Sequence, residues 1–153
     1  MTEHHYTECG LNNVVIHGIE PELDDDGDAV ITIPAINELH LVIAQGIVQH
    51  EAGISGSELR FLRTEMGLTQ SELARLVHRD KQSVGRWERG EVELDSVSEA
   101  FIRRLAIERL ELPTALGMDE LSQRSVRGSA TQQIDVERIE ANDDGVRYQL
   151  QAA

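Results

Sequence analysis

Hydrophobic residues recur at two different periods along the chain, and these periods predict the order of its elements. β-Branched runs at 13–19 and 28–33, separated by an acidic turn-prone segment, predict the two strands of an N-terminal β-hairpin with a long loop. Pro34 then suits the first turn of a helix, and the apolar residues after it recur at three- or four-residue steps. An amphipathic helix is therefore expected over 35–50.

Four further helices are expected in the middle of the chain. A Ser or Thr followed three residues later by Glu suggests a capping box, in which each side chain bonds the other residue's backbone N–H. The candidate boxes are Ser55–Glu58, Thr69–Glu72 and Ser96–Glu99, and the expected helices are 56–66, 70–77, 81–89 and 97–112. Gly67 and Gly90 stand where left-handed helix ends favour glycine, and Pro113 would stop the last helix.

The apolar positions of these helices also recur every three or four residues and are expected to form a core. They are Leu59, Leu62, Met66, Leu73, Leu76, Val77, Val84, Trp87, Phe101, Leu105 and Leu112. Residues 113–130 are rich in Ser, Gly, Gln and Arg and are predicted to be a linker. Alternating residues around Asn142 to Gly145 predict a C-terminal β-hairpin.

The expected fold is mainly α with small β elements, arranged in three parts. Residues 1–54 would form an acidic hairpin-and-helix module, 55–112 a helical domain, and 113–153 a linker with the C-terminal hairpin. The 153 residues contain one cysteine, which excludes an internal disulfide. No apolar run is long enough to span a membrane and no signal peptide is evident, so a cytoplasmic location is expected.

Charge is distributed unevenly along the chain. The formal net charge of −14 argues against a protein that is basic overall, as many nucleic-acid binders are. Residues 1–54 hold ten acids and no Lys or Arg, whereas residues 56–90 hold seven basic residues against five acids. This asymmetry suggests that different regions meet different partners, although the acidic arms could equally be plain solvated surface.

The segment 59–90 carries the most specific motif in the chain. Its characteristic residues are Arg63, Gly67-Leu68-Thr69-Gln70, Glu72-Leu73-Ala74, Val84 and Trp87-Glu88-x-Gly90. In this combination the segment resembles the helix-turn-helix of the Xre family, the phage-repressor-like DNA-binding domains. The resemblance covers about residues 55–112 and implies a lambda-repressor-like domain. His78 occupies the tight turn where that family usually has Gly, and His tolerates a left-handed backbone better than a β-branched residue does.

The spacing of the two short helices agrees with this resemblance. Two helices separated by three residues place the second in the major groove of DNA. Lys81 and Gln82 lie in the first turn of the second helix and Arg86 lies one turn further on. Lys or Arg can donate to guanine and Gln can bond adenine, so these three are expected to read bases. The resemblance further implies that Gln70 and Ser83 contact phosphates or flanking bases.

Two more roles follow for this segment. Val84 and Trp87 fall on the opposite face of the second helix, which suits the core. The resemblance implies that Arg63 and Glu88 form a structural ion pair inside the domain. Arg79 stands where the family usually has an apolar residue and is treated as surface charge.

The N-terminal part raises the question of a metal site. His4, His5, Cys9 and His17 are residue types that zinc accepts, but their spacing matches no closed zinc motif. No metal or other cofactor is therefore expected. The layout, a small β-containing unit before an Xre-like domain, is similar to the MqsA (YgiT-type) antitoxins, whose front unit is a zinc fold that binds the toxin. The single cysteine here means that the zinc site is absent, while an anionic module could still neutralise a cationic toxin.

The leading hypothesis is a sequence-specific DNA-binding transcriptional regulator, a repressor or the antitoxin of a toxin–antitoxin pair. Binding to duplex DNA would use a homodimer on two half-sites about 34 Å apart, formed through the 97–112 helix or the terminal hairpins. The alternative is a protein-interaction module whose helix-turn-helix no longer binds DNA, which the net charge of −14 favours. Catalysis is the poorest hypothesis, because no phosphate-binding glycine loop, HExxH or GxSxG motif is present.

Overall fold

The structure is a computed structural model of the chain that describes residues 3–125, 132–141 and 145–151. Its strands are β1 (Glu3–His5), β2 (Val14–His17), β3 (Glu22–Leu23), β4 (Ala29–Val30), β5 (Ile134–Ala141) and β6 (Gly145–Leu150). Its helices are α1 (Ile36–Gln49), α2 (Gly56–Glu65), α3 (Gln70–Leu76), α4 (Lys81–Glu88), α5 (Ser96–Leu110) and α6 (Met118–Arg124). The fold is mainly α with small β elements, as the sequence predicts. Among the described residues, no helix is long and apolar enough to cross a membrane.

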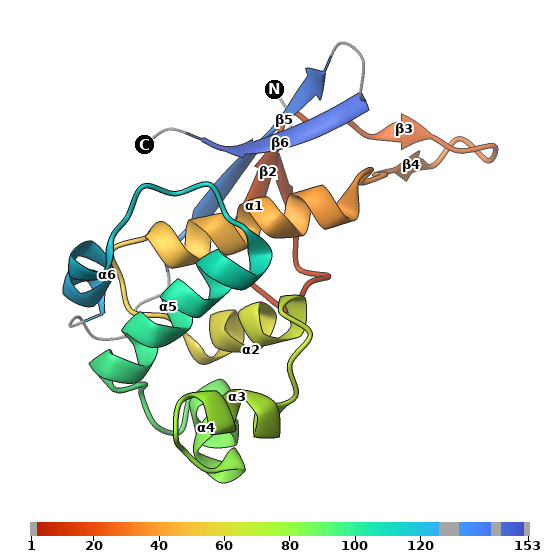
Figure 1. Cartoon of the computed structure of the whole chain (residues 1–153). Coiled ribbons are helices and arrows are strands. Elements are labelled where there is room, and N and C mark those ends of the chain that lie inside the picture. The colour runs from red at the N-terminus through yellow and green to blue at the C-terminus, as the bar shows by residue number, and fades with distance from the viewer. Residues whose placement is uncertain (1–2, 126–131, 142–144, 152–153) are drawn as a thin grey trace.

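The sheet unites segments from both ends of the sequence. Its strand order is β1-β2-β5-β6, with β2 antiparallel to β1 and parallel to β5. In Figure 1, α1 lies along this sheet, and the remaining helices extend away from it with α3 and α4 at the far end. Gly46 allows α1 to approach the sheet closely, because a Cβ at that position would lie 2.8 Å from Cγ2 of Ile134.

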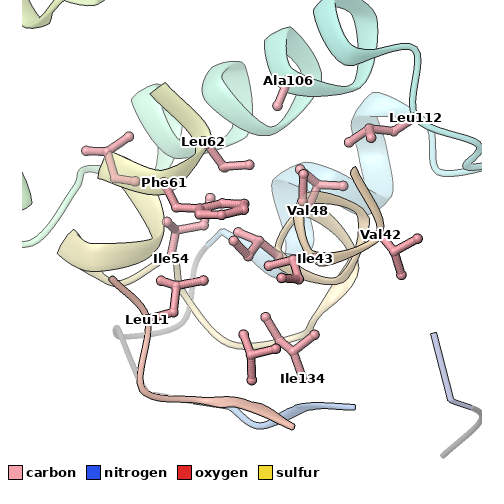
Figure 2. Close-up of a cluster of buried hydrophobic side chains, with 14 of the residues drawn as sticks. Leu11, Val42, Ile43, Val48, Ile54, Phe61, Leu62, Ala106, Leu112 and Ile134 are labelled. Atoms are coloured by element: carbon pink, nitrogen blue, oxygen red, sulfur yellow. The ribbon is translucent and has the colours of Figure 1, made fainter. Parts of the chain in front are cut away.

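One connected cluster of buried hydrophobic side chains runs from the sheet through α1 into the helical part. Figure 2 shows Phe61 and Leu62 of α2 gathered with Ile43 and Val48 of α1, and Ala106 of α5 beside them. Of these five, Ile43, Val48, Leu62 and Ala106 are fully buried. The helix α1 thus lies between two layers, with one side packed on the sheet and the other on α2 and α5.

Buried polar groups hold the connection between α1 and α2 in place. Arg103 of α5 is fully buried, and its guanidinium donates to the carbonyl oxygens of Val48, His50 and Ala52 at 3.0, 2.9 and 2.6 Å. The buried carboxylate of Glu58 lies 3.1 Å from Nε2 of His50. The bonds from Arg103 satisfy backbone carbonyls at the end of α1 and in the segment that follows it.

The prediction that 13–19 and 28–33 form an N-terminal hairpin is wrong. Residues 13–19 and 28–33 do not pair with each other: β2 lies between β1 and β5, while β4 pairs with β3 in a separate two-stranded sheet. The apolar side chains of Val14 and Ile16 are fully buried, so the sequence pattern did predict β2 as a strand. Its partners come from elsewhere in the chain, and a local pattern does not identify them.

The helices begin and end close to the expected positions. Pro34 lies outside α1, because the residue before the helix is Ala35 in a left-handed conformation with φ 53°. The capping boxes at Ser55 and Thr69 are confirmed, and Gly67 and Gly90 have φ of 73° and 74° as expected.

The predicted start and buried face of α5 need correction. Its N-cap is Asp95, whose carboxylate accepts the N–H of Ser98 at 3.0 Å, so the capping box predicted at Ser96 is wrong. Glu99 instead accepts the N–H of Ile54 at 2.9 Å. Phe101 is 41% exposed rather than in the core, whereas Ile102 is fully buried. The helix ends at Leu110, ahead of Pro113.

The C-terminal part contains one element that the sequence did not indicate. The helix α6 lies within the predicted linker, and its Leu121 is fully buried. Leu121 is the one buried residue of this helix, so the sequence offered no apolar periodicity that would predict it. Residues 126–131 of that linker lie outside the described residues. The C-terminal hairpin is confirmed, since β5 and β6 pair antiparallel up to Ala141 and Gly145, and its turn at 142–144 is also outside them.

Candidate nucleic-acid interface

Two short helices, α3 and α4, meet at a tight turn at the end of the molecule opposite the sheet (Figure 1). The turn is made by His78, whose φ is 59°, as expected for a residue that replaces the usual glycine. The N–H of Arg79 donates to the carbonyl oxygen of Ala74 at 2.9 Å and closes the end of α3. The chain thereby reverses within a few residues and starts α4 at Lys81.

Both helices are capped at their N-termini by side chains. The hydroxyl of Thr69 accepts the N–H of Glu72 at 3.1 Å, and the carboxylate of Glu72 accepts the N–H of Thr69 at 3.0 Å. Asp80 caps α4 by accepting the N–H of Ser83 at 2.8 Å. Hydrogen bonds from Ser83 hold the pKa of Asp80 below its usual value. The carboxylate at the start of α4 therefore stays charged and fixes the first turn of the helix.

The inward face of α4 is apolar and fixed. Val84 is fully buried and Trp87 is 3% exposed, and both belong to the hydrophobic core together with Leu73 of α3. The two helices therefore share one core, and the direction of the outer face of α4 is set by this packing.

The outward face of α4 carries the three residues predicted to read bases. Lys81, Gln82 and Arg86 are all exposed and make no hydrogen bond or ion pair within the part of the chain that the structure describes. Ser83 is half-buried and bonds Asp80. The structure brings the first three together as one exposed surface with two positive charges, and Ser83 lies at its edge.

Glu88 at the end of α4 is the centre of a hydrogen-bond network. Its carboxylate accepts from Nε and Nη2 of Arg63 at 2.6 and 3.1 Å. The amide of Gln70 also donates to it, at 3.0 Å, and a third nitrogen of Arg63 donates to the carbonyl oxygen of Leu68 at 2.9 Å. Gln70, expected to face DNA, is therefore held by the same carboxylate that holds Arg63.

Arg79 has a structural environment that the sequence did not reveal. Its guanidinium donates to the carboxylate of Asp95 at 2.8 Å and lies 5.5 Å from the centroid of the Trp87 ring. The side chain of Arg79, which stands where the Xre pattern has an apolar residue, thus covers the ring of Trp87. Long side chains of Arg can cover apolar surface while their charge stays in water, so the substitution is compatible with the fold.

The histidines and the cysteine near the N-terminus make separate contacts. His17 contacts Asp135 at 2.9 Å, the ring of His5 contacts the carbonyl oxygen of Asn12 at 2.6 Å, and Cys9 is half-buried elsewhere. His4 lies 3.9 Å from Glu8. Across the described residues, no three His, Cys, Asp or Glu side chains are placed to hold a metal ion.

Comparison with known proteins identifies the middle of the chain. No curated protein and no solved structure matches the chain. Residues 56–112 match a family of helix-turn-helix domains, and this range contains α2 to α5 with the tight turn and the exposed face of α4. Domains of this kind are typical of DNA-binding regulators. On this match and this geometry, residues 56–112 are a helix-turn-helix domain.

Proposed function

We propose that the protein is a sequence-specific transcriptional regulator that acts as a repressor and reads operator DNA with Lys81, Gln82 and Arg86. The observation that supports this most is the outward face of α4, where these side chains are exposed without internal partners. Exposed positive groups on a recognition helix are suited to phosphates and guanine, and an exposed Gln amide to adenine.

Gln70 and Ser83 are proposed as backbone-contacting residues. The amide nitrogen of Gln70 carries two hydrogens, of which Glu88 accepts one, so the other is available to a phosphate oxygen. Glu88 then orients the amide, and Arg63 in turn orients Glu88. Such contacts position a protein on the duplex and carry little sequence information.

A homodimer is proposed through the outer face of α5. Val97 is 78% exposed and Phe101 is 41% exposed, and the two lie one helical turn apart on the same face. Exposed apolar residues that are neighbours on a helix favour association with a second apolar surface. Two copies would supply the two recognition helices that a pair of half-sites requires.

An additional antitoxin role is proposed for the acidic N-terminal part, in line with the MqsA-like layout. Residues 20–31, which contain the β3–β4 hairpin, are all exposed and hold six acids and no basic residue. Figure 1 shows this hairpin projecting from the body of the molecule, away from α3 and α4. A basic toxin protein could bind there while α4 remains free for DNA.

The second candidate is a protein-interaction module whose helix-turn-helix does not bind DNA. The net charge of −14 favours it, since acidic surface repels phosphate. The two hypotheses differ in the role of the outward face of α4, so substitutions on that face distinguish them.

The test begins with selection of a preferred duplex from randomised DNA with the full chain, followed by binding measurements by fluorescence anisotropy. Gln82→Ala and Arg86→Ala should each cost about 1–3 kcal/mol on the selected duplex and much less on random DNA. Gln70→Ala should weaken binding to both duplexes about equally, because it removes a phosphate contact.

The matched control is Gln123→Ala, which removes an exposed Gln from α6, away from the helix-turn-helix. It should leave both affinities unchanged. Failure to select any duplex, or selected-duplex affinities in Gln82→Ala and Arg86→Ala equal to the parent's, would refute the DNA-reading proposal and favour the interaction module.

A further inference from the structure

A cavity of about 450 Å³ lies between the N-terminal part and the helix-turn-helix domain. Its walls come from the loop after β1, from one face of α2, and from single residues of α1 and α4. In Figure 1 this loop runs down beside α2. The volume is within the range of about 300–1,000 Å³ that is usual for small-molecule sites.

The rim of the cavity carries two opposite charges. Arg60 of α2 is exposed and has no hydrogen bond or ion pair within the described part of the chain. Glu8 belongs to the same cavity, and its side chain is 62% exposed. One oxygen of Glu8 accepts the N–H of Thr7 at 3.1 Å, and the other lies 3.9 Å from Nε2 of His4. Both oxygens therefore retain capacity to accept further hydrogen bonds.

Hydroxyl groups flank the cation on α2. Ser57 and Thr64 line the cavity one turn before and one turn after Arg60, so all three lie on one face of the helix. An anionic group placed against Arg60 would meet a guanidinium and two hydroxyl donors. Guanidinium and carboxylate match in geometry, because two parallel N–H bonds can meet the two oxygens.

The inner wall is already satisfied and rigid. Nδ1 of His40 lies 2.8 Å from the carboxylate of Glu65, and its Nε2 lies 2.9 Å from the hydroxyl of Tyr6. The rings of Phe61 and His40 pack edge to face, with their centroids 5.3 Å apart. Burial raises the pKa of the Cys9 thiol, so this residue adds no charge to the wall. Of the charged groups around the cavity, Arg60 and Glu8 are thus those with unused capacity for a ligand.

We propose that this cavity binds a small zwitterion, of which an α-amino acid is the simplest kind. Arg60, with Ser57 and Thr64, receives the carboxylate, and Glu8 receives the ammonium group. L-Arginine is the chosen probe, because agmatine supplies a matched ligand that lacks only the carboxylate.

The site lies where a ligand can influence DNA binding. Glu88 lines the cavity and is also the acceptor for Gln70, so a ligand near it affects a residue that we assign to the DNA backbone. This consequence depends on the proposed function, whereas ligand binding itself does not. Calorimetry without DNA tests the site alone, and operator binding with and without ligand tests the coupling.

The decisive experiment is calorimetric titration of the full chain with L-arginine and with agmatine, which has the same guanidine but no carboxylate. L-Arginine should bind more tightly by about tenfold or more, as expected for loss of a charge-assisted bidentate contact. Arg60→Gln and Glu8→Gln should each weaken L-arginine binding by about tenfold or more. Arg109→Gln and Glu22→Gln remove exposed charges away from the cavity and should leave the affinity for L-arginine unchanged.

A second measurement is independent of the variants. In amide NMR spectra of the parent protein, L-arginine should shift the signals of residues 8–10 and 57–64 more than those of the β3–β4 hairpin. The proposal is overturned if L-arginine gives no binding, if agmatine binds equally well, or if the Arg60 and Glu8 variants keep the parent affinity. The last result would mean that Arg60 and Glu8 do not contact the ligand.

Discussion

The replacement of Arg63 by alanine tests the network around Glu88. The change removes three guanidinium hydrogen bonds, two to the carboxylate of Glu88 and one to the carbonyl oxygen of Leu68. The side chain of Glu88 is 5% exposed, so its charge is left buried with only the amide of Gln70 beside it. Removal of one partner of a buried ion pair typically costs about 3–5 kcal/mol. Because one hydrogen bond remains, we expect about 3 kcal/mol, at the lower end of that range.

An exposed ion pair of the same chemistry supplies the control. The side chains of Arg79 and Asp95 are 43% and 40% exposed, and such pairs contribute about 0–1 kcal/mol. Arg79→Ala should therefore have a much smaller effect than Arg63→Ala. The double variant Arg63→Ala/Glu88→Ala should be less destabilised than the sum of its single variants, because it also removes the unpaired charge.

Urea unfolding followed by fluorescence is the appropriate assay, since the chain has a single tryptophan, Trp87, inside the same domain. The free energy of unfolding comes from the midpoint and slope of the transition. Equal losses in Arg63→Ala and Arg79→Ala, or an additive double variant, would show that the Arg63–Glu88 contact does not stabilise the domain in the way proposed here.

Three further changes have expected outcomes. Asp80→Ala should lower the urea midpoint at neutral pH, because it removes the cap of α4. Hydrogen bonds from Ser83 lower the pKa of Asp80, so the difference between variant and parent should vanish as acid protonates this carboxylate. Equal midpoints at neutral pH would contradict the capping role of Asp80. Burial raises the pKa of Tyr6 from 10.0 to about 12, so stability should fall as pH rises through this interval, and should fall less in Tyr6→Phe. Replacement of the four aspartates within 24–28 by asparagine should raise affinity for random DNA, because it removes negative charge that repels phosphates. The gain should be largest at low salt, because charges more than about 10 Å apart are largely screened at 0.1 M, and unchanged low-salt affinity would exclude that repulsion.

Features set by neighbouring residues were predictable from the sequence. The helices α2, α3 and α4 follow from caps and apolar spacing within a few residues, and the tight turn at His78 follows from the distance between two of them. The outward placement of Lys81, Gln82 and Arg86 follows from the same periodicity, because Val84 and Trp87 must point inward. Local rules were sufficient for these three helices, whereas at α5 they assigned the cap to Ser96 in place of Asp95.

Features set by distant residues were not predictable in this way. The parallel partner of β2 is β5, which the spacing around Val14 does not indicate. The bond between Gln70 and Glu88 depends on how α3 and α4 pack. Arg103 is buried because three backbone carbonyls of another segment surround it, although an isolated helix pattern would assign an arginine to solvent.

The parallel pairing of β2 with β5 has a consequence for how the chain folds during its synthesis on the ribosome. The helix-turn-helix can collapse once its own helices have been synthesised, whereas the strands next to α1 are encoded after it, at 134–150. Until those strands emerge, the side of α1 around Gly46 has no β5 to pack against and stays open to water. A translational stall or a protease acting in that interval would leave a formed helix-turn-helix domain attached to an uncovered apolar helix. Transiently exposed apolar surface of this kind promotes aggregation and chaperone binding, and the sheet that covers α1 can form only after β5 has been synthesised.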